Sequence, residues 1–102
     1  MSIIIKERIY NHYIYIDDGK TKLTREQFIK DNFIATNDKN ERLHTETICD
    51  IVNKKGFKLN IIHIGRIFNE MQIGKYTNKC YIDKVKKGGF EYIKFIGTVP
   101  DP

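Results

Sequence analysis

The chain has 102 residues, 40% of them hydrophobic and 30% charged, and a formal net charge of +5 at pH 7. This length suits one domain, and the composition excludes a chain that is disordered throughout. No apolar run approaches the roughly 20 residues of a membrane span, and the opening MSIIIKER lacks the charge order of a secretory signal, so we expect an intracellular protein without a membrane partner.

Residues 1–23 are predicted to form a β-like extension. The run IYNHYIYI is rich in β-branched and aromatic residues, which favours a strand, although its spacing also fits a helix. Asp18-Gly19 is typical of a turn, after which residues 20–23 can return as a partner strand. We expect this extension to pack on the core or to pair in a homodimer.

A first helix is predicted over residues 25–34. Thr24 and Gln27 have the spacing of a capping box, in which the hydroxyl and the amide satisfy backbone N–H groups at the helix start. One face of this helix is apolar and carries Phe28, Ile29 and Phe33. The polar run TNDKNER, residues 36–42, predicts a loop.

A second helix follows, with Thr45 as its predicted N-cap and Glu46 near the positive end of the helix dipole. Its buried face is defined by apolar residues three and four apart, namely Ile48, Ile51 and Val52. Lys54 and Lys55 suit the last turn, and Gly56 stands where a left-handed C-cap is needed.

A third helix is predicted over residues 61–72, with Asn60 as its N-cap. The expected core side carries Ile61, Ile64, Phe68 and Met71. The expected exposed side carries Ile62, His63, Arg66, Asn69 and Glu70. Because residues 56–60 form a short connection between this helix and the preceding one, the pair is consistent with a helix-turn-helix.

The apolar period changes beyond Gly74 and predicts a β-hairpin. Cys80, Ile82 and Val85 stand on one side of the run Lys86-Lys87-Gly88-Gly89, and Phe90, Tyr92, Ile93 and Phe95 on the other. We expect the paired glycines to form the turn, which gives the hairpin a positively charged tip. The predicted fold is therefore α+β: a winged helix-turn-helix over residues 24–97, with three helices and a C-terminal hairpin wing, followed by a tail over residues 98–102.

Positive charge is concentrated in the second half of the chain. Residues 1–53 carry eight Lys and Arg against nine Asp and Glu, whereas residues 54–97 carry ten against three. One cationic face favours binding of a polyanion such as nucleic acid. Alternatively, the lysines serve only solubility, reflect an AT-rich genome, or keep an edge strand from aggregating.

The segments FIKDNFIATNDKNERLHTETICDIVNKKG, IGRIFNEMQIG and FEYIKFIG resemble the winged-helix domain at the C-terminus of the primase-helicases of large DNA viruses, phages and mobile elements. In that family a segment of the type Phe-Gly-Arg-Arg-Leu begins the recognition helix. Residues 64–68, IGRIF, take its place here and keep the Gly-Arg pair without the first aromatic residue and the second arginine. The resemblance spans residues 25–97 and implies DNA binding in replication or transcription control, in the cytoplasm or nucleus of a host cell.

The chain departs from that family because it has no room for the ATPase domain. Gly74-Lys75 resembles part of a phosphate-binding loop, but Asn69 stands where the first glycine is required and Tyr76 where Ser or Thr is required. We therefore expect an excised module or a free-standing relative that binds DNA without catalysis.

The predicted nucleic-acid interface joins helix 61–72 to the hairpin. Arg66 is expected to pair with a base edge, because its planar fork matches guanine, and His63 and Asn69 are expected to assist. The other residues predicted to contact nucleic acid are Lys58, Asn60, Ile62, Lys75, Tyr76, Lys84, Lys86 and Lys87. Duplex DNA is the favoured ligand, with single-stranded DNA or RNA as alternatives.

A protein-interaction module is the alternative function, since Ile62 is apolar on the predicted exposed face and winged helices also dock proteins. No catalytic residue, cofactor or metal site is expected. The three histidines are scattered, and Cys49 and Cys80 have no partner at ligand or nucleophile spacing. We expect both thiols to be reduced and packed.

Overall fold

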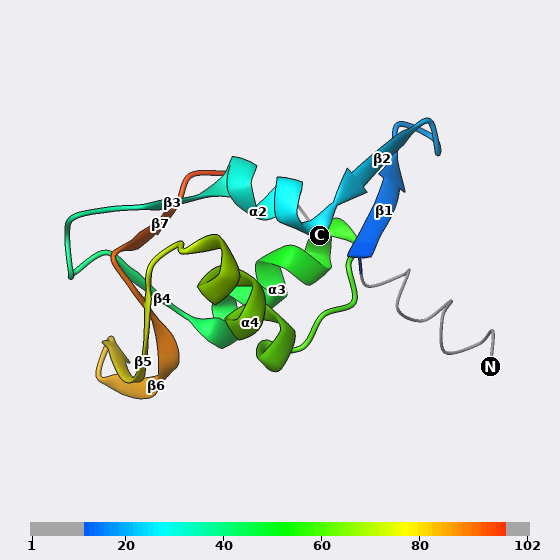
Figure 1. The fold of residues 1–102 in the computed structure, drawn as a ribbon. Helices are drawn as coiled ribbons and strands as arrows, with labels where there is room; N and C mark the ends of the chain where they lie inside the picture. The colour runs from blue at the N-terminus through cyan, green and yellow to red at the C-terminus, as the bar shows by residue number, and fades with distance from the viewer. Residues whose placement is uncertain (1–11, 98–102) are drawn as a thin grey trace.

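The computed structural model describes residues 12–97, which form an α+β fold of short helices and small antiparallel sheets (Figure 1). The predicted α+β class is confirmed. The predictions for residues 1–11, within the expected N-terminal extension, and for the tail 98–102 lie outside the described residues. Among residues 12–97, no helix is both long enough and apolar enough to cross a membrane.

The described part of the chain begins with a short hairpin, β1 (Tyr13–Ile16) and β2 (Thr21–Thr24), which pair antiparallel. The predicted turn at Asp18-Gly19 is confirmed: residues 17–20 form it, and Gly19 takes a φ of +83°. The backbone N–H of Gly19 donates to the carbonyl of Ile16 at 3.1 Å. Figure 1 shows this hairpin extending away from the helices.

Helix α2 (Arg25–Asn32) begins where the sequence predicts but ends two residues earlier. Thr24 Oγ1 accepts the backbone N–H of Gln27 at 3.1 Å, which is half of the predicted capping box. The Gln27 amide donates instead to Asp31 Oδ1 at 2.8 Å. Phe33 is buried, as expected, but in strand β3 (Phe33–Ala35), because pairing with β7 (Ile93–Phe95) replaces the last helical turn.

The loop of residues 36–41 leads into strand β4 (Arg42–His44) and helix α3 (Thr45–Lys55). The prediction of Thr45 as the N-cap is wrong, because His44 holds that position and Thr45 is the first helical residue. His44 is paired with Gly89 in the sheet, and its ring Nε2 lies 2.9 Å from the carbonyl oxygen of Cys80. These two contacts keep His44 extended, so the helix starts after it.

Asn53 holds the connection between α3 and α4 (Ile61–Met71) in place. Its Nδ2 donates to the Leu59 carbonyl at 2.7 Å, and its Oδ1 accepts the Leu59 N–H at 2.9 Å. Gly56 takes a φ of +129°, so the predicted need for positive φ at this position is confirmed. Phe57 and Leu59 are buried between the helices and the rest of the core.

The predicted position of α4 and its N-cap, Asn60, are confirmed, but one residue predicted to lie in the core does not. Its buried face is centred on Ile64, Ile67 and Phe68. Ile61, which the spacing places in the core, is 51% exposed. It belongs to the first turn, where it lines an open pocket instead of the core.

The C-terminal sheet has the order β4-β6-β5, with β5 spanning Lys75–Ile82 and β6 spanning Val85–Glu91. The predicted turn is wrong: residues 83 and 84 make it, both at positive φ, and residues 86–89 lie inside β6. A Cβ on Gly89 would lie 2.6 Å from the carbonyl oxygen of Leu43 and 2.9 Å from Cβ and Sγ of Cys80. Glycine is therefore required here for close approach between strands and not for a turn.

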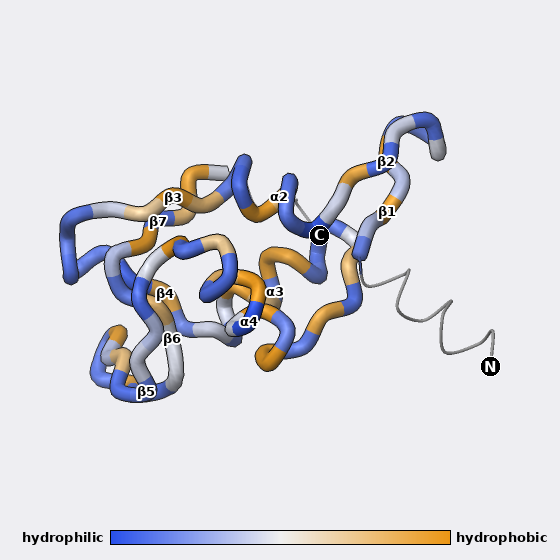
Figure 2. Tube along the Cα trace, in the orientation of Figure 1, coloured by the Kyte–Doolittle hydropathy of each residue, from blue (hydrophilic) through white to orange (hydrophobic). Residues whose placement is uncertain are grey.

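The strand predicted through Tyr92 is interrupted at that residue, which has a φ of +60°. This kink ends β6 and lets β7 pair with β3. The core then closes around phenylalanine rings, with Phe68 and Phe90 5.3 Å apart and Phe33 and Phe68 5.4 Å apart. Figure 2 shows hydrophobic residues gathered in α3 and α4 and hydrophilic residues along the loop 36–41.

Candidate nucleic-acid interface

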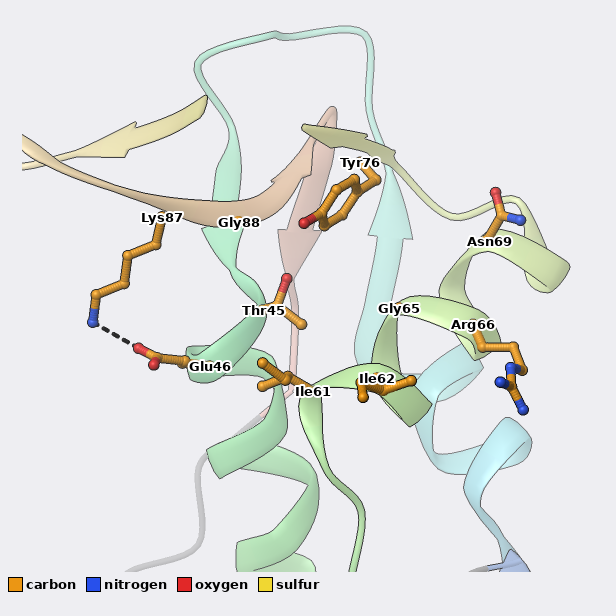
Figure 3. A pocket seen from close by; sticks show the side chains of 10 residues that line it. All are labelled: Thr45, Glu46, Ile61, Ile62, Gly65, Arg66, Asn69, Tyr76, Lys87 and Gly88. Carbon is orange, nitrogen blue, oxygen red and sulfur yellow. Dashed lines mark hydrogen bonds and ion pairs between the residues drawn. The ribbon is translucent and has the colours of Figure 1, made fainter. Parts of the chain in front are cut away.

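A pocket of about 710 Å³ lies between the start of α3, the exposed face of α4 and the sheet (Figure 3). Its lining comes from all three parts: Thr45 and Glu46 from α3; Ile61, Ile62, Gly65, Arg66 and Asn69 from α4; and Tyr76, Lys87 and Gly88 from β5 and β6. Figure 3 shows Arg66 and Lys87 on opposite sides of this space. Five predicted site residues, Ile62, Arg66, Asn69, Tyr76 and Lys87, are thus brought together.

The α4 wall is partly apolar. Ile61 and Ile62 are exposed, with Ile62 66% accessible. Gly65 follows one turn later, and a Cβ built on it would meet no atom within 4 Å. The absence of a side chain at Gly65 therefore leaves open space along the helix backbone.

The opposite wall is formed by Tyr76 at the beginning of β5. Its ring stands edge-on to Phe90, with centroids 5.5 Å apart, and the residue is 54% exposed. A Cβ on Gly88 would lie 2.7 Å from the Tyr76 hydroxyl oxygen. Gly88 thus allows the phenol to lie close to β6.

Thr45 supplies a polar group without a partner. It is 6% exposed, and its Oγ1 is buried and has no hydrogen-bond partner among the described residues. Figure 3 shows its hydroxyl pointing from the start of α3 into the space beside Tyr76. A buried hydroxyl without a partner destabilises a protein, so an acceptor or donor entering the pocket can compensate.

Lys87 is not a free cation, because its Nζ lies 2.6 Å from Glu46 Oε2. The hydrogen bond from Lys87, together with its charge, holds the pKa of Glu46 below its ordinary value. Both side chains are about half exposed, which weakens the attraction through solvent screening. The positive charge of Lys87 is thus partly balanced by an acidic residue that the sequence analysis did not place at the site.

The remaining predicted lysines are exposed outside the pocket lining. Lys58 lies in the connection between α3 and α4, Lys75 begins β5, and Lys84 lies in the hairpin turn. Lys86 is exposed in β6, next to Lys87 of the pocket lining.

Asn60 and His63 are engaged in capping α4. The Asn60 Oδ1 accepts the His63 N–H at 2.9 Å, and His63 Nδ1 accepts the Asn60 N–H at 3.3 Å. Each side chain therefore stabilises the start of the helix. A ligand can contact only the atoms not used in these hydrogen bonds, namely the rest of the His63 ring and the Asn60 amide nitrogen.

Sequence reasoning missed Thr45, Glu46, Ile61, Gly65 and Gly88 as pocket residues. Gly65 could have been found from the sequence, because a glycine in the interior of a helix destabilises it and therefore indicates a packing or functional role. The other four depend on the packing of α3 and β6 beside α4, which residues far apart in the sequence determine.

Cys49 and Cys80 are free and buried, which confirms their predicted packing role. Burial raises the pKa of both thiols, so they are less reactive than an exposed cysteine. Within residues 12–97, no group of three or more His, Cys, Asp or Glu side chains is arranged to hold a metal ion.

No protein-family model, curated protein or solved structure matches this chain.

Proposed function

We propose that the chain is a winged helix-turn-helix protein that binds nucleic acid, with duplex DNA as the favoured ligand. The order of elements supports this proposal: α2 and β4 precede the helix pair α3–α4, and the hairpin β5–β6 follows. In such a domain α4 is the recognition helix and the hairpin is the wing. The observation that carries the proposal is that Arg66 and the hairpin frame one surface (Figure 3).

The positive charge of the second half of the chain also supports nucleic acid as the ligand. The elements that form this surface come mainly from residues 54–97, which carry ten basic and three acidic residues. Exposed lysines along the hairpin can neutralise phosphates and release counterions, which gives affinity without sequence selection. Arg66, exposed on α4, is the residue suited to a guanine edge.

The resemblance to the winged-helix domain of viral and phage primase-helicases suggests a role in replication or transcription control without catalysis. It rests on the Gly65-Arg66 pair and the glycine-containing hairpin. Gly65 lines the pocket beside Arg66, so the two residues that carry the resemblance lie at the proposed interface.

The proposal is tested by a mobility-shift titration of duplex DNA over a range of salt concentrations. Replacing Lys84 and Lys86 together by alanine is expected to weaken binding about tenfold and to reduce the salt slope by about two, since each lost phosphate contact removes about one. The matched control replaces Lys20 and Lys30, which are exposed on β1–β2 and α2. Retention of no duplex at low salt, or equal loss in the control, contradicts the proposal.

Sequence preference is tested separately by selection from random duplexes. Arg66→Ala is expected to relax the preference at one base pair, at a cost of about 1–3 kcal/mol for the preferred site. An unchanged selected sequence would show that Arg66 reads no base.

A protein-interaction module is the second candidate. The exposed apolar residues Ile61, Ile62 and Tyr76 lie around one pocket, and Glu46 reduces its positive charge. Clustered apolar surface of this kind is typical of docking sites. Failure to bind any nucleic acid would favour this function.

A further inference from the structure

The pocket beside α4 has properties that duplex binding leaves unexplained. A helix that reads the major groove presents polar side chains to base edges. Here the first turn of α4 presents Ile61 and Ile62, and the surface is hollowed to about 710 Å³. This volume falls within the range in which proteins bind compact ligands.

We infer that this pocket receives one unpaired nucleobase of the bound nucleic acid, held between Tyr76 and the apolar start of α4. The inference rests on the proposed function and names the part of the ligand that the site recognises. Unpaired bases are commonly held by stacking on aromatic side chains and by hydrogen bonds to their exposed edges. Tyr76, 54% exposed, offers an aromatic surface, and Ile61 and Ile62 offer apolar contact on the other side.

Polar groups for the base edge are also in place. Asn69 lines the pocket and carries both a donor and an acceptor. The Thr45 hydroxyl, buried and without a partner among residues 12–97, points into the same space (Figure 3). A base supplies donors and acceptors on one planar edge, which matches these groups better than an aliphatic side chain does.

Gly65 supports a flat occupant that comes close to the helix backbone. Glycine is unfavourable in a helix interior, and nothing in the described protein requires it, since a Cβ there would meet no atom within 4 Å. A side chain at this position would instead extend into the pocket. Glycine is thus explained if a ligand occupies that space.

Charge favours a nucleic-acid strand over an apolar protein segment as the source of the occupant. Arg66 and Lys87 line the pocket, and Lys75 and Lys86 are exposed on the strands that form its wall. The pocket lining itself holds two cations and one acidic residue, Glu46, which pairs with Lys87. The phosphates on either side of an unpaired nucleotide would meet positive charge from both walls.

The inference is tested by fluorescence anisotropy with three DNAs of equal length: a perfect duplex, the same duplex with one bulged 2-aminopurine, and a single strand. The full-length protein is expected to bind the bulged duplex about tenfold more tightly than the perfect duplex, as expected for stacking of one base. The emission of 2-aminopurine is expected to fall on binding, because the base becomes stacked on Tyr76. Free adenosine monophosphate is expected not to compete at equal concentration, because it lacks the flanking phosphates.

Two variants test whether the preference for the bulged duplex arises at this pocket. Gly65→Ala and Tyr76→Leu are each expected to reduce the tenfold preference for the bulged over the perfect duplex to about twofold or less. Gly65→Ala is also expected to melt at the same or a higher temperature, since alanine favours helix and meets no neighbour, so loss of preference cannot come from unfolding. Glu70→Ala, exposed on α4 outside the pocket lining, is the matched control and should keep the preference.

The outcomes separate this inference from the proposed function. Duplex binding without preference for the bulge overturns the inference and leaves the proposed function standing. A preference that survives Gly65→Ala and Tyr76→Leu also overturns it, because the base then binds elsewhere. Absence of binding to all three DNAs overturns both and favours a protein as the partner of the apolar surface.

Discussion

The two hairpins of this protein use glycine for different physical reasons. In β1–β2, Gly19 lies in the turn at a φ of +83°, and no atom would contact a Cβ there. In β5–β6, Gly89 lies within the central strand of a sheet, where a Cβ would meet Leu43 and Cys80 at less than 3 Å. Glycine is therefore needed for backbone conformation in the first hairpin and for lack of volume in the second.

The hairpins also differ in charge. In the first hairpin, residues 13–24, Asp17 and Asp18 are balanced by Lys20 and Lys22, whereas the second hairpin, residues 75–91, carries five lysines against Asp83 and Glu91. Only the second hairpin lies beside α4, where Lys87 lines the pocket and pairs with Glu46. Position and charge together make the second hairpin the candidate for contact with a polyanion.

Among the glycine substitutions in the two hairpins, Gly89→Ala is expected to cause the largest loss of stability. The added methyl must displace the Leu43 backbone or the buried Cys80 side chain, so we expect a loss of about 3 kcal/mol and a fall in Tm of roughly 10–20 °C. Thermal unfolding followed by circular dichroism measures it.

Gly88→Ala is the control for that prediction. The three atoms nearest to its methyl would belong to the hydroxyl end and ring of the exposed Tyr76, which can move away. We expect a loss below about 1 kcal/mol. Equal losses in the two variants would contradict a volume requirement specific to Gly89.

Gly19→Ala is expected to have an intermediate effect. The loss should be about 1–2 kcal/mol, because a non-glycine residue is strained at positive φ even where space is open. Urea unfolding at equilibrium measures it. Gly19→Asn should recover part of the loss, since asparagine tolerates this conformation; no recovery would show that the loss has another cause.

The smallest effect is expected from Glu46→Gln, which releases Lys87. DNA affinity at low salt should rise about two- to fivefold, because one acidic charge leaves the interface and one lysine becomes available. Asp50→Asn, exposed one turn further along α3, is the control for a general change in net charge. An equal rise in both variants would contradict a local role for the Glu46–Lys87 pair.

Protonation of Glu46 at acidic pH should also raise DNA affinity, because it too releases Lys87. Because the folded-state pKa of Glu46 is lowered, its pair with Lys87 stabilises the fold above the carboxyl group's unfolded pKa and is lost as pH falls through the lower, folded value. The pair is therefore intact from about pH 6 to 8, since carboxyl groups are ionised there. Across that range the DNA affinities of the wild type and Glu46→Gln should change in parallel, and the two curves should converge as pH falls through the lowered pKa of Glu46.

Local signals predicted most of the helices. Thr24 and Asn60 cap the helices that follow them, and the apolar faces of α3 and α4 are buried at Ile48, Val52, Ile64 and Phe68. These features depend on residues within about four positions of one another, whose side chains and backbone groups meet as soon as a helix forms. The α+β class and the order of its main elements followed from them.

Contacts between distant residues decided the rest. His44 became the N-cap of α3 because of its contact with Cys80, 36 residues away. Glycine is required at position 89 because Leu43 and Cys80 of the two neighbouring strands leave no room for a side chain. The pocket likewise exists because α3 and β6 bring Thr45, Glu46 and Gly88 beside α4. The sequence by itself determined where α2 and α4 start, the turn at Gly19 and where positive charge is concentrated, since these are local properties. Only the tertiary structure decided that Gly89 lies in a strand and which residues share a surface, because volume and proximity depend on the packing of the whole chain.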